Sequence, residues 1–161
     1  MAKKPKNPPQ IVSPANLFGP CGMFCGFCTS FLAKKYQIPR RRGIISYCDG
    51  CRPRDKKCSF LKMRCNMLLN HKIEYCTECE DFACENLEKI EQKYLAKFKY
   101  PYSFKQALGE IQEHGPLQVI ERLQKNHGCP KCGEILCIHN GLCYNCDQDQ
   151  IAAMKNYRND L

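Results

Sequence analysis

The clearest pattern of hydrophobic and polar positions lies in the middle of the chain. Apolar side chains recur there at steps of three and four residues: Leu87, Ile90, Tyr94, Leu95 and Phe98. This spacing places them on one face of a helix, and we expect that face to pack in a core. Pro101 interrupts the pattern, because proline lacks the amide that a helix interior needs.

Two further helices are predicted after Pro101. Ser103 and Gln106 have the spacing of a capping box, and Gly115 supplies a stop. Pro116 suits the first turn of the next helix, which ends near Gly128. The apolar positions of these helices are predicted to be core: Leu108, Ile111, Leu117, Ile120 and Leu123.

Shorter elements flank this stretch. Residues 29–37 and 59–71 are candidate short helices, and Asp147 with Gln150 is placed to cap a last one. That last helix would carry Ile151, Met154 and Tyr157. Outside one hairpin near the C-terminus, no alternating run typical of a β-strand occurs in the sequence. The pattern therefore predicts a mainly α-helical protein.

The number and spacing of the cysteines indicate metal binding. Of the 161 residues, 15 are cysteine. Many form CysXXCys pairs, at 25/28, 48/51, 76/79, 129/132 and 143/146. A two-residue gap lets both sulfurs point at one ion, and two such pairs complete a tetrahedron. We therefore expect two to three zinc sites that stabilise a fold with little core.

The N-terminal residues indicate a compartment that keeps thiols reduced. Residues 1–20 are rich in lysine and proline, and no apolar segment follows them, so they do not resemble a signal peptide. No run approaches the roughly 20 apolar residues of a membrane helix. We expect a soluble, cytoplasmic protein. A disulfide framework, the alternative use of so many cysteines, is typical of secreted proteins.

The sharpest motif is Cys129-Pro-Lys-Cys132-Gly, which is typical of a zinc knuckle. Residues 134–138 and 142–144 are then predicted to pair as a β-hairpin around Asn140-Gly141, a strong turn signal. The hairpin brings a second knuckle to the first and forms a zinc ribbon. Its predicted ligands are Cys129, Cys132, Cys143 and Cys146.

Cys137 and His139 lie inside the predicted hairpin. Zinc accepts nitrogen, so His139 is an alternative ligand, but four cysteines already close the tetrahedron. We interpret His139 as a turn histidine that hydrogen-bonds backbone, and the role of Cys137 stays open. A closed site leaves no position for a substrate water, so we expect no catalytic turnover from zinc.

The N-terminal cysteines allow more than one grouping. Cys25/Cys28 and Cys48/Cys51 are separated by nineteen residues, as in paired zinc knuckles. Cys76/Cys79 would then join Cys58 and Cys65, but interleaved pairings are equally allowed. The candidate metal ligands of this part are Cys21, Cys25, Cys28, Cys48, Cys51, Cys58, Cys65, Cys76, Cys79 and Cys84.

Iron is the alternative to zinc in residues 20–86. All-cysteine ligation also suits a four-iron four-sulfur cluster, which would serve electron transfer or a redox enzyme complex. Cys21-x3-Cys25-x2-Cys28 matches the signature of radical S-adenosylmethionine enzymes, but the chain lacks the repeated βα units of that fold. A thioredoxin-like use of Cys25 and Cys28 lacks the buried strand that should precede it.

The charge of the chain is less informative about function than its cysteines are. The formal net charge is +9, but three zinc ions with four thiolates each would lower it to about +3. Residues 29–64 are mainly basic and residues 74–91 mainly acidic, so the two blocks can face each other. We expect a protein partner. Nucleic acid, bound through the basic stretch Lys34–Arg42 with Tyr36 and Tyr47 nearby, is the alternative.

The cysteine order resembles a prokaryotic family known as domain of unknown function 3795. The shared pattern is Cys21-Gly-x2-Cys25-x2-Cys28, then Cys48-Asp-Gly-Cys51, then Cys76-Thr-Glu-Cys79 and Cys84-Glu-Asn-Leu. Members tend to have proline where this chain has Ala83. Many continue through a helix with HisGly, here 114–115, into a CysProXCysGly ribbon. The resemblance covers about residues 20–146 and implies an intracellular bacterial or archaeal metal-binding protein.

We therefore expect a small metal-stapled protein, mainly α, with an irregular Cys-rich module and a C-terminal zinc-ribbon β-hairpin. The expected segments are a flexible basic arm (1–19), a multi-metal module (20–86), a helical segment (87–127), the ribbon (128–147) and a short helix or tail (148–161). The expected function is non-enzymatic: a zinc-binding adaptor for protein or nucleic acid.

Overall fold

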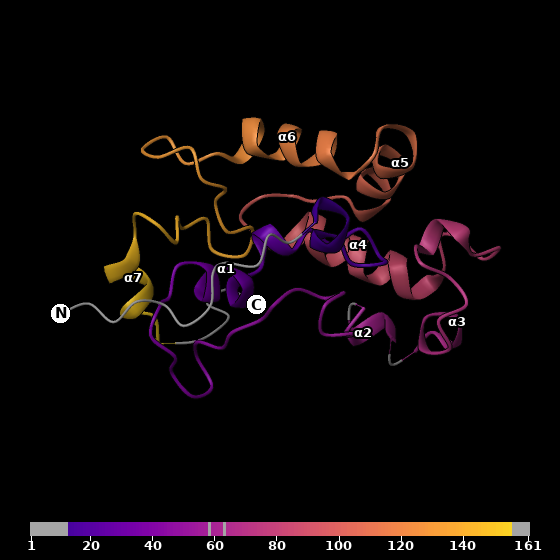
Figure 1. The fold of residues 1–161 in the computed structure, drawn as a ribbon, viewed down its shortest axis with the longest axis horizontal. Coiled ribbons are helices and arrows are strands. Elements are labelled where there is room, and N and C mark those ends of the chain that lie inside the picture. The colour runs from indigo at the N-terminus through magenta and orange to yellow at the C-terminus, as the bar shows by residue number, and fades with distance from the viewer. Residues whose placement is uncertain (1–12, 58, 63, 156–161) are drawn as a thin grey trace.

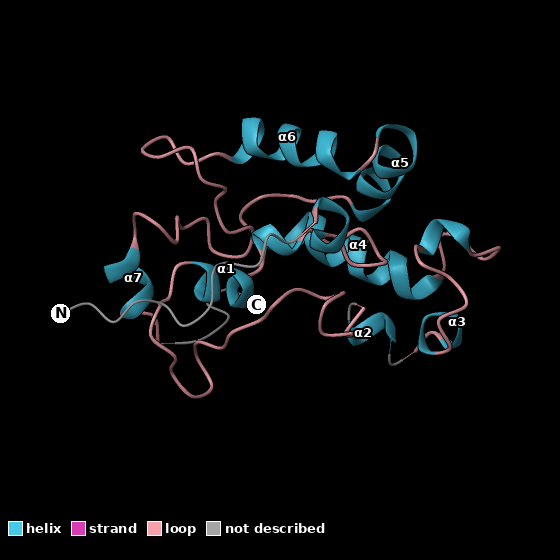
Figure 2. Ribbon diagram, in the orientation of Figure 1, coloured by secondary structure: helices cyan, strands magenta, loops and turns pink. Residues whose placement is uncertain are grey.

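The computed structural model describes residues 13–57, 59–62 and 64–155 and is mainly helical (Figures 1 and 2). The α-helices are α1 (Thr29–Lys35), α2 (Ser59–Lys62), α3 (Asn66–Leu69), α4 (Glu85–Lys97), α5 (Phe104–His114), α6 (Pro116–His127) and α7 (Gln148–Ala152). Short 3-10 helices cover Pro14–Leu17, Cys25–Phe27 and Cys76–Glu78. Within the described residues, β-structure is limited to isolated bridges, so the mainly α prediction is confirmed.

The long helices α4, α5 and α6 form where the sequence predicts them. Two of the apolar side chains expected in the core are instead exposed: Leu95 of α4 at 48% and Leu117 of α6 at 55%. Ser103 precedes α5, and its hydroxyl accepts the amide of Gln106 at 3.1 Å, as in a capping box. The side chain of Gln106 donates instead to Glu110, at 2.7 Å. Pro116 occupies the first turn of α6, where a missing amide costs nothing.

A glutamate of α4 holds the start of α5. Glu91 is only 3% exposed, and its carboxylate accepts hydrogen bonds from the Ser103 hydroxyl at 2.5 Å and the Phe104 amide at 2.6 Å. The Lys105 amide adds a longer bond at 3.3 Å. A carboxylate is well placed at a helix N-terminus, because the first amides of a helix lack partners in the helix itself.

The main core joins the N-terminal segment to these helices. Its buried side chains include Phe18, Phe24, Phe27, Leu61, Leu87, Leu108 and Leu123. The two parts approach each other closely at Gly22, where an added Cβ would lie 2.7 Å from the Phe104 carbonyl oxygen. Tyr102 donates a hydrogen bond to the Gly22 carbonyl at 2.7 Å. The cysteine-rich segment is therefore built onto the helical segment.

A second core joins the α1 region to the C-terminal part of the chain. It contains Leu32, Ala33, Ile38, Ile45, Cys137, Tyr144, Ile151 and Met154. Figure 1 shows α7 and α1 at the same end of the molecule, away from α3. Lys35 and Glu134 form an ion pair of 2.7 Å between the same two parts. The C-terminal segment therefore packs on the α1 region, about a hundred residues earlier in sequence.

The shorter predicted elements are confirmed in part. Helix α1 lies within the predicted 29–37, but 59–71 contains two separate short helices, α2 and α3. Cys65, directly before α3, has an extended backbone with φ of −115°, which is incompatible with one continuous helix. Helix α7 forms next to Asp147. Residues 1–12 of the expected arm and Tyr157 of the expected last helix lie outside the described residues.

The predicted β-hairpin of 134–138 with 142–144 is wrong. Ile135 forms a bridge with Gly128, and the Leu136 amide donates to the His127 carbonyl at 2.9 Å. The backbone of 134–136 thus pairs with the end of α6, and these groups are no longer available to residues 142–144. One pair of bonds remains around Asn140-Gly141, from the Cys137 amide to Leu142 and from the Gly141 amide to Cys137.

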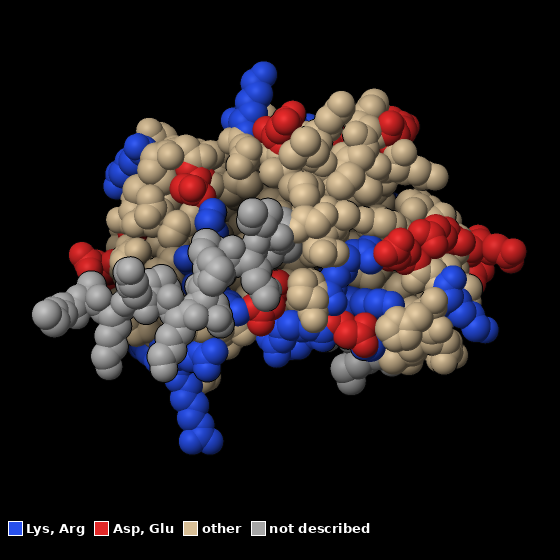
Figure 3. All heavy atoms as spheres, in the orientation of Figure 1, with Lys and Arg blue, Asp and Glu red and all other residues tan. Residues whose placement is uncertain are grey.

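Charges of both signs mix on the surface. On the face drawn in Figure 3, lysine and arginine side chains lie beside aspartates and glutamates. One pair joins the basic and acidic blocks of the sequence, Arg52 with Glu74 at 3.4 Å. None of the helices in the described part of the chain combines the length and apolar character required to span a bilayer.

A candidate metal centre

Four cysteines converge at the C-terminal side of α6. The sulfurs of Cys129, Cys132, Cys143 and Cys146 all lie within 4.8 Å of one another. The Cys132 and Cys143 sulfurs are 3.5 Å apart. A zinc ion with four thiolates at about 2.3 Å needs sulfurs about 3.8 Å apart, so the group has the size of one tetrahedral site. The ligand set predicted for the zinc ribbon is thus brought together, although the hairpin expected to do so is absent.

The first turn of the centre grows directly out of α6. The Cys129 amide donates to the Glu134 carbonyl at 2.7 Å, and the Gly133 amide donates to the Cys129 carbonyl at 2.8 Å. Gly133 has a φ of +76°, a left-handed conformation that glycine adopts without a Cβ penalty. The bridge at Gly128 anchors this turn to the last residues of the helix.

The second turn is held by Asp147. Its carboxylate accepts the Cys143 amide at 2.9 Å, and its own amide donates to the Cys143 carbonyl at 2.8 Å. Lys131 of the first turn lies 3.7 Å from the same carboxylate. We expected Asp147 to cap α7 with its side chain. Instead its side chain closes the Cys143–Cys146 turn, a role that the spacing Cys-x3-Asp could have suggested.

The electrostatics of the centre favour a cation. The Glu134 amide, as the main cause, lowers the pKa of Cys132 to about 7. The hydrogen bond with Cys132 and burial raise the pKa of Cys146 to about 12. Thiolates this close repel one another, so all four ionise together when a positive ion lies between them. Cys129 and Cys143 are buried, whereas Cys132 and Cys146 are exposed.

His139 and Cys137 are not among the four converging residues. The His139 Nε2 shares a hydrogen bond of 3.2 Å with the Tyr94 hydroxyl, and its ring packs against Phe98 at 4.7 Å. Cys137 is fully buried, and burial raises its pKa to about 12. No local pattern predicts that Tyr94 and Phe98 of the α4 region lie around His139, because they are some forty residues away in the chain.

The N-terminal cysteines occupy two environments. Cys21 and Cys76 are buried in the main core, and Cys65, Cys79 and Cys84 are half-buried against it. Cys25, Cys28, Cys48 and Cys51 lie around the start of α1 and the 48–51 loop. Cys58 lies outside the described residues. No disulfide bond joins any two of the described cysteines.

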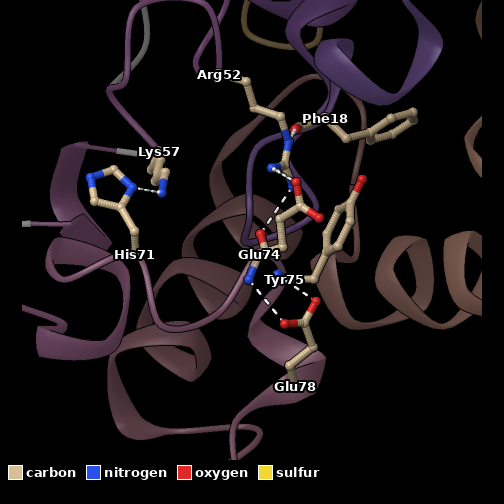
Figure 4. A network of polar contacts seen from close by, with 7 residues as sticks. All are labelled: Phe18, Arg52, Lys57, His71, Glu74, Tyr75 and Glu78. Carbon is tan, nitrogen blue, oxygen red and sulfur yellow. Dashed lines mark hydrogen bonds and ion pairs between the residues drawn. The ribbon is translucent and has the colours of Figure 1, made fainter.

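Arg52 fixes the loop that follows Cys51 (Figure 4). Its guanidinium donates to the carbonyls of Phe18, at 2.8 Å, and Glu74, at 3.0 Å. It also stacks on the Tyr75 ring, with the carbon of the guanidinium 4.4 Å from the ring centroid. One side chain therefore joins three segments that each border a cysteine, and such bidentate and stacked contacts favour arginine over lysine.

Comparison with known proteins gives a match to one family model over part of the chain. No curated protein matches the chain. No solved structure matches it either. Residues 17–89 match the model of a family described as "Protein of unknown function (DUF3795)". The resemblance inferred from the order of the N-terminal cysteines, to the family DUF3795, is thus confirmed over residues 17–89.

Proposed function

We propose that this chain is a non-enzymatic zinc protein, in which Cys129, Cys132, Cys143 and Cys146 hold one structural ion. The convergence of their four sulfurs within 4.8 Å carries the proposal. Four cysteines suit zinc, whose structural sites are tetrahedral and closed. A closed site offers no open position for a substrate, so the ion supports folding and a binding surface, not turnover.

Zinc at this position would replace the missing hairpin as the link between the two turns. The turns are tied internally, by Glu134 and Asp147, and few backbone bonds cross between them. Apparent binding energies of structural zinc are about 10–16 kcal/mol, which exceeds what so small a segment gains from its own packing. The ion would thereby hold residues 128–147 against the second core.

We propose a protein, in preference to a nucleic acid, as the partner, and a reducing compartment such as the cytoplasm as the location. Several cations of the basic stretch Lys34–Arg42 already bond within the molecule. Lys34 pairs with Asp49, Lys35 with Glu134, and Arg41 donates to the Ala152 carbonyl. The two ion pairs compensate part of the positive charge that phosphates would need, and the bond to Ala152 occupies a guanidinium donor.

The experiment is metal analysis of anaerobically purified protein with an absorption spectrum. We expect a colourless protein with stoichiometric zinc, and Cys146→Ser should contain one zinc fewer per chain. Cys146 is exposed, so serine leaves no cavity there. Lys131→Ser, at another exposed position of the centre, is the control and should keep the zinc. Unchanged zinc in Cys146→Ser would overturn the proposed site.

The same purified protein also tests the two alternatives, an iron–sulfur cluster and binding to nucleic acid. A brown protein with stoichiometric iron would replace the zinc proposal by the iron–sulfur alternative. Tight binding to RNA or DNA that weakens steeply with salt would replace the protein partner by nucleic acid.

A further inference from the structure

A second set of cysteine turns meets at the start of α1. Cys25 opens the 3-10 helix Cys25–Phe27, and Cys28 directly precedes α1. The 48–51 loop is brought to this place by the Cys48 amide, which donates to the Ser30 carbonyl at 3.1 Å. The hydroxyls of Ser30 and Ser46 hydrogen-bond to each other at 3.0 Å. The two CysXXCys turns are therefore positioned by bonds that do not involve sulfur.

One cysteine from each turn, Cys25 and Cys51, brings the two turns into direct contact. The Cys51 amide donates to the Cys25 sulfur at 3.3 Å, and the Cys25 and Cys51 side chains are hydrogen-bonded. Cys28 lies near both Cys48 and Cys51. Gly50 lies beside Cys25, since a Cβ there would be in ordinary contact with the Cys25 sulfur at 3.7 Å. Its φ of +108° favours glycine at this turn.

In both sets of cysteines, the sulfur accepts hydrogen bonds from backbone amides two or three residues later in the chain. At the C-terminal centre, Cys132 accepts the amide two residues later, from Glu134, and Cys143 accepts those of Asn145 and Cys146. At the second set, Cys48 accepts the Gly50 amide at 3.4 Å. Cys28 likewise accepts the amides of Ser30 and Phe31. Amides that point at sulfur stabilise the thiolate form that binds metals.

We infer that Cys25, Cys28, Cys48 and Cys51 form a second tetrathiolate zinc site. This choice selects one partition of the N-terminal cysteines. Cys21 and Cys76 pack in the main core. Cys21 also lies near Cys51, since both contact the Cβ position of Gly19, so Cys21 is the competing ligand. The site would fasten the 48–51 loop to the start of α1. It is independent of the ion proposed at the C-terminal centre, and either can fail without the other.

Measuring the zinc content of serine variants tests the two proposed sites separately. Cys28→Ser and Cys48→Ser should each lose one zinc per chain relative to wild type, and combining either with Cys146→Ser should lose two. Asp49→Ala is the matched control, because it lies in the same loop, is exposed and bonds Lys34 without touching sulfur. It should keep all zinc. Unchanged zinc in both serine variants would overturn the second site, while loss in Cys146→Ser would still support the first.

Cadmium NMR of the wild-type chain tests the same inference without any variant. Cadmium replaces zinc at thiolate sites and couples to the β-protons of its cysteine ligands. One cadmium should couple to Cys25, Cys28, Cys48 and Cys51, and another to the four C-terminal cysteines. A cadmium that couples to Cys25 together with Cys21 or Cys76 would overturn the proposed partition, as would stoichiometric iron at these residues.

Discussion

The Tyr36 hydroxyl donates a hydrogen bond to the carboxylate of Glu134, ninety-eight residues later in the chain. Tyr36 directly follows α1, and Glu134 ends the first turn of the C-terminal centre. Lys35 reaches the same carboxylate at 2.7 Å. Burial, with the Glu134 hydrogen bond as the next cause, raises the pKa of Tyr36 above its ordinary value, so the phenol stays protonated and can donate.

A double-mutant cycle should detect this link. Tyr36→Phe and Glu134→Ala are each expected to lower the free energy of unfolding. Their coupling energy should be about 0.5–1.5 kcal/mol, because a hydrogen bond across a partly exposed contact is worth that much. Urea unfolding of the reduced, metal-loaded protein is the measurement. The pair Tyr36→Phe and Glu121→Ala is the control and should be additive; additivity of the first pair would show that the bond contributes nothing.

The buried carboxylate of Glu91 should be among the more sensitive positions of the helical segment. Glu91→Ala leaves the buried Phe104 amide and the Ser103 hydroxyl without this acceptor, and we expect a loss of about 3 kcal/mol. Glu91→Gln keeps one acceptor oxygen and should lose less. Gln92→Ala, at an exposed position of the same helix, should stay within about 0.5 kcal/mol of wild type. Equal effects of Glu91→Ala and Gln92→Ala would contradict the capping role.

Two glycines should respond to alanine in opposite directions. At Gly22 the φ is +88° and a Cβ would lie 2.7 Å from the Phe104 carbonyl oxygen, so Gly22→Ala should destabilise by about 1–3 kcal/mol. Gly109 lies inside α5 with nothing within 4 Å of its Cβ position. Gly109→Ala should therefore stabilise by about 0.5–1 kcal/mol. The shifts in thermal midpoint give both signs. A midpoint that does not fall for Gly22→Ala would count against the packing at Gly22, and one that falls for Gly109→Ala would contradict the open space at Gly109.

Cys137 should behave as a core residue, not as a metal ligand. It is 0% exposed, so iodoacetamide should leave it unmodified in the native protein and modify it after unfolding. Peptide mass spectrometry locates the label. Cys137→Ala should keep the zinc content of wild type, whereas Cys143→Ala should lose one zinc. Loss of zinc from Cys137→Ala would make Cys137 a ligand and displace one of the four cysteines assigned to the centre.

Local features of the fold were predictable from sequence because they depend on neighbours in the chain. The apolar period of residues 87–98, the cap at Ser103 and the proline at 116 act within one or two turns of helix. The four cysteines of the C-terminal centre were predictable for the same reason, since each CysXXCys pair is one turn. The cysteine order likewise indicated the family that residues 17–89 match.

Other features of the fold depend on which of several alternative partners a group meets, and the local sequence does not show this. Ile135 had to pair either within the expected hairpin or with Gly128, and the end of α6 supplied the partner. The cap of α5 by Glu91 and the bond from Tyr36 to Glu134 likewise depend on how whole segments pack. Residue type and spacing along the chain establish which residues can cap, turn or ligate. The tertiary structure determined which of them meet, because each backbone group or sulfur takes few partners, and packing selects among those within reach.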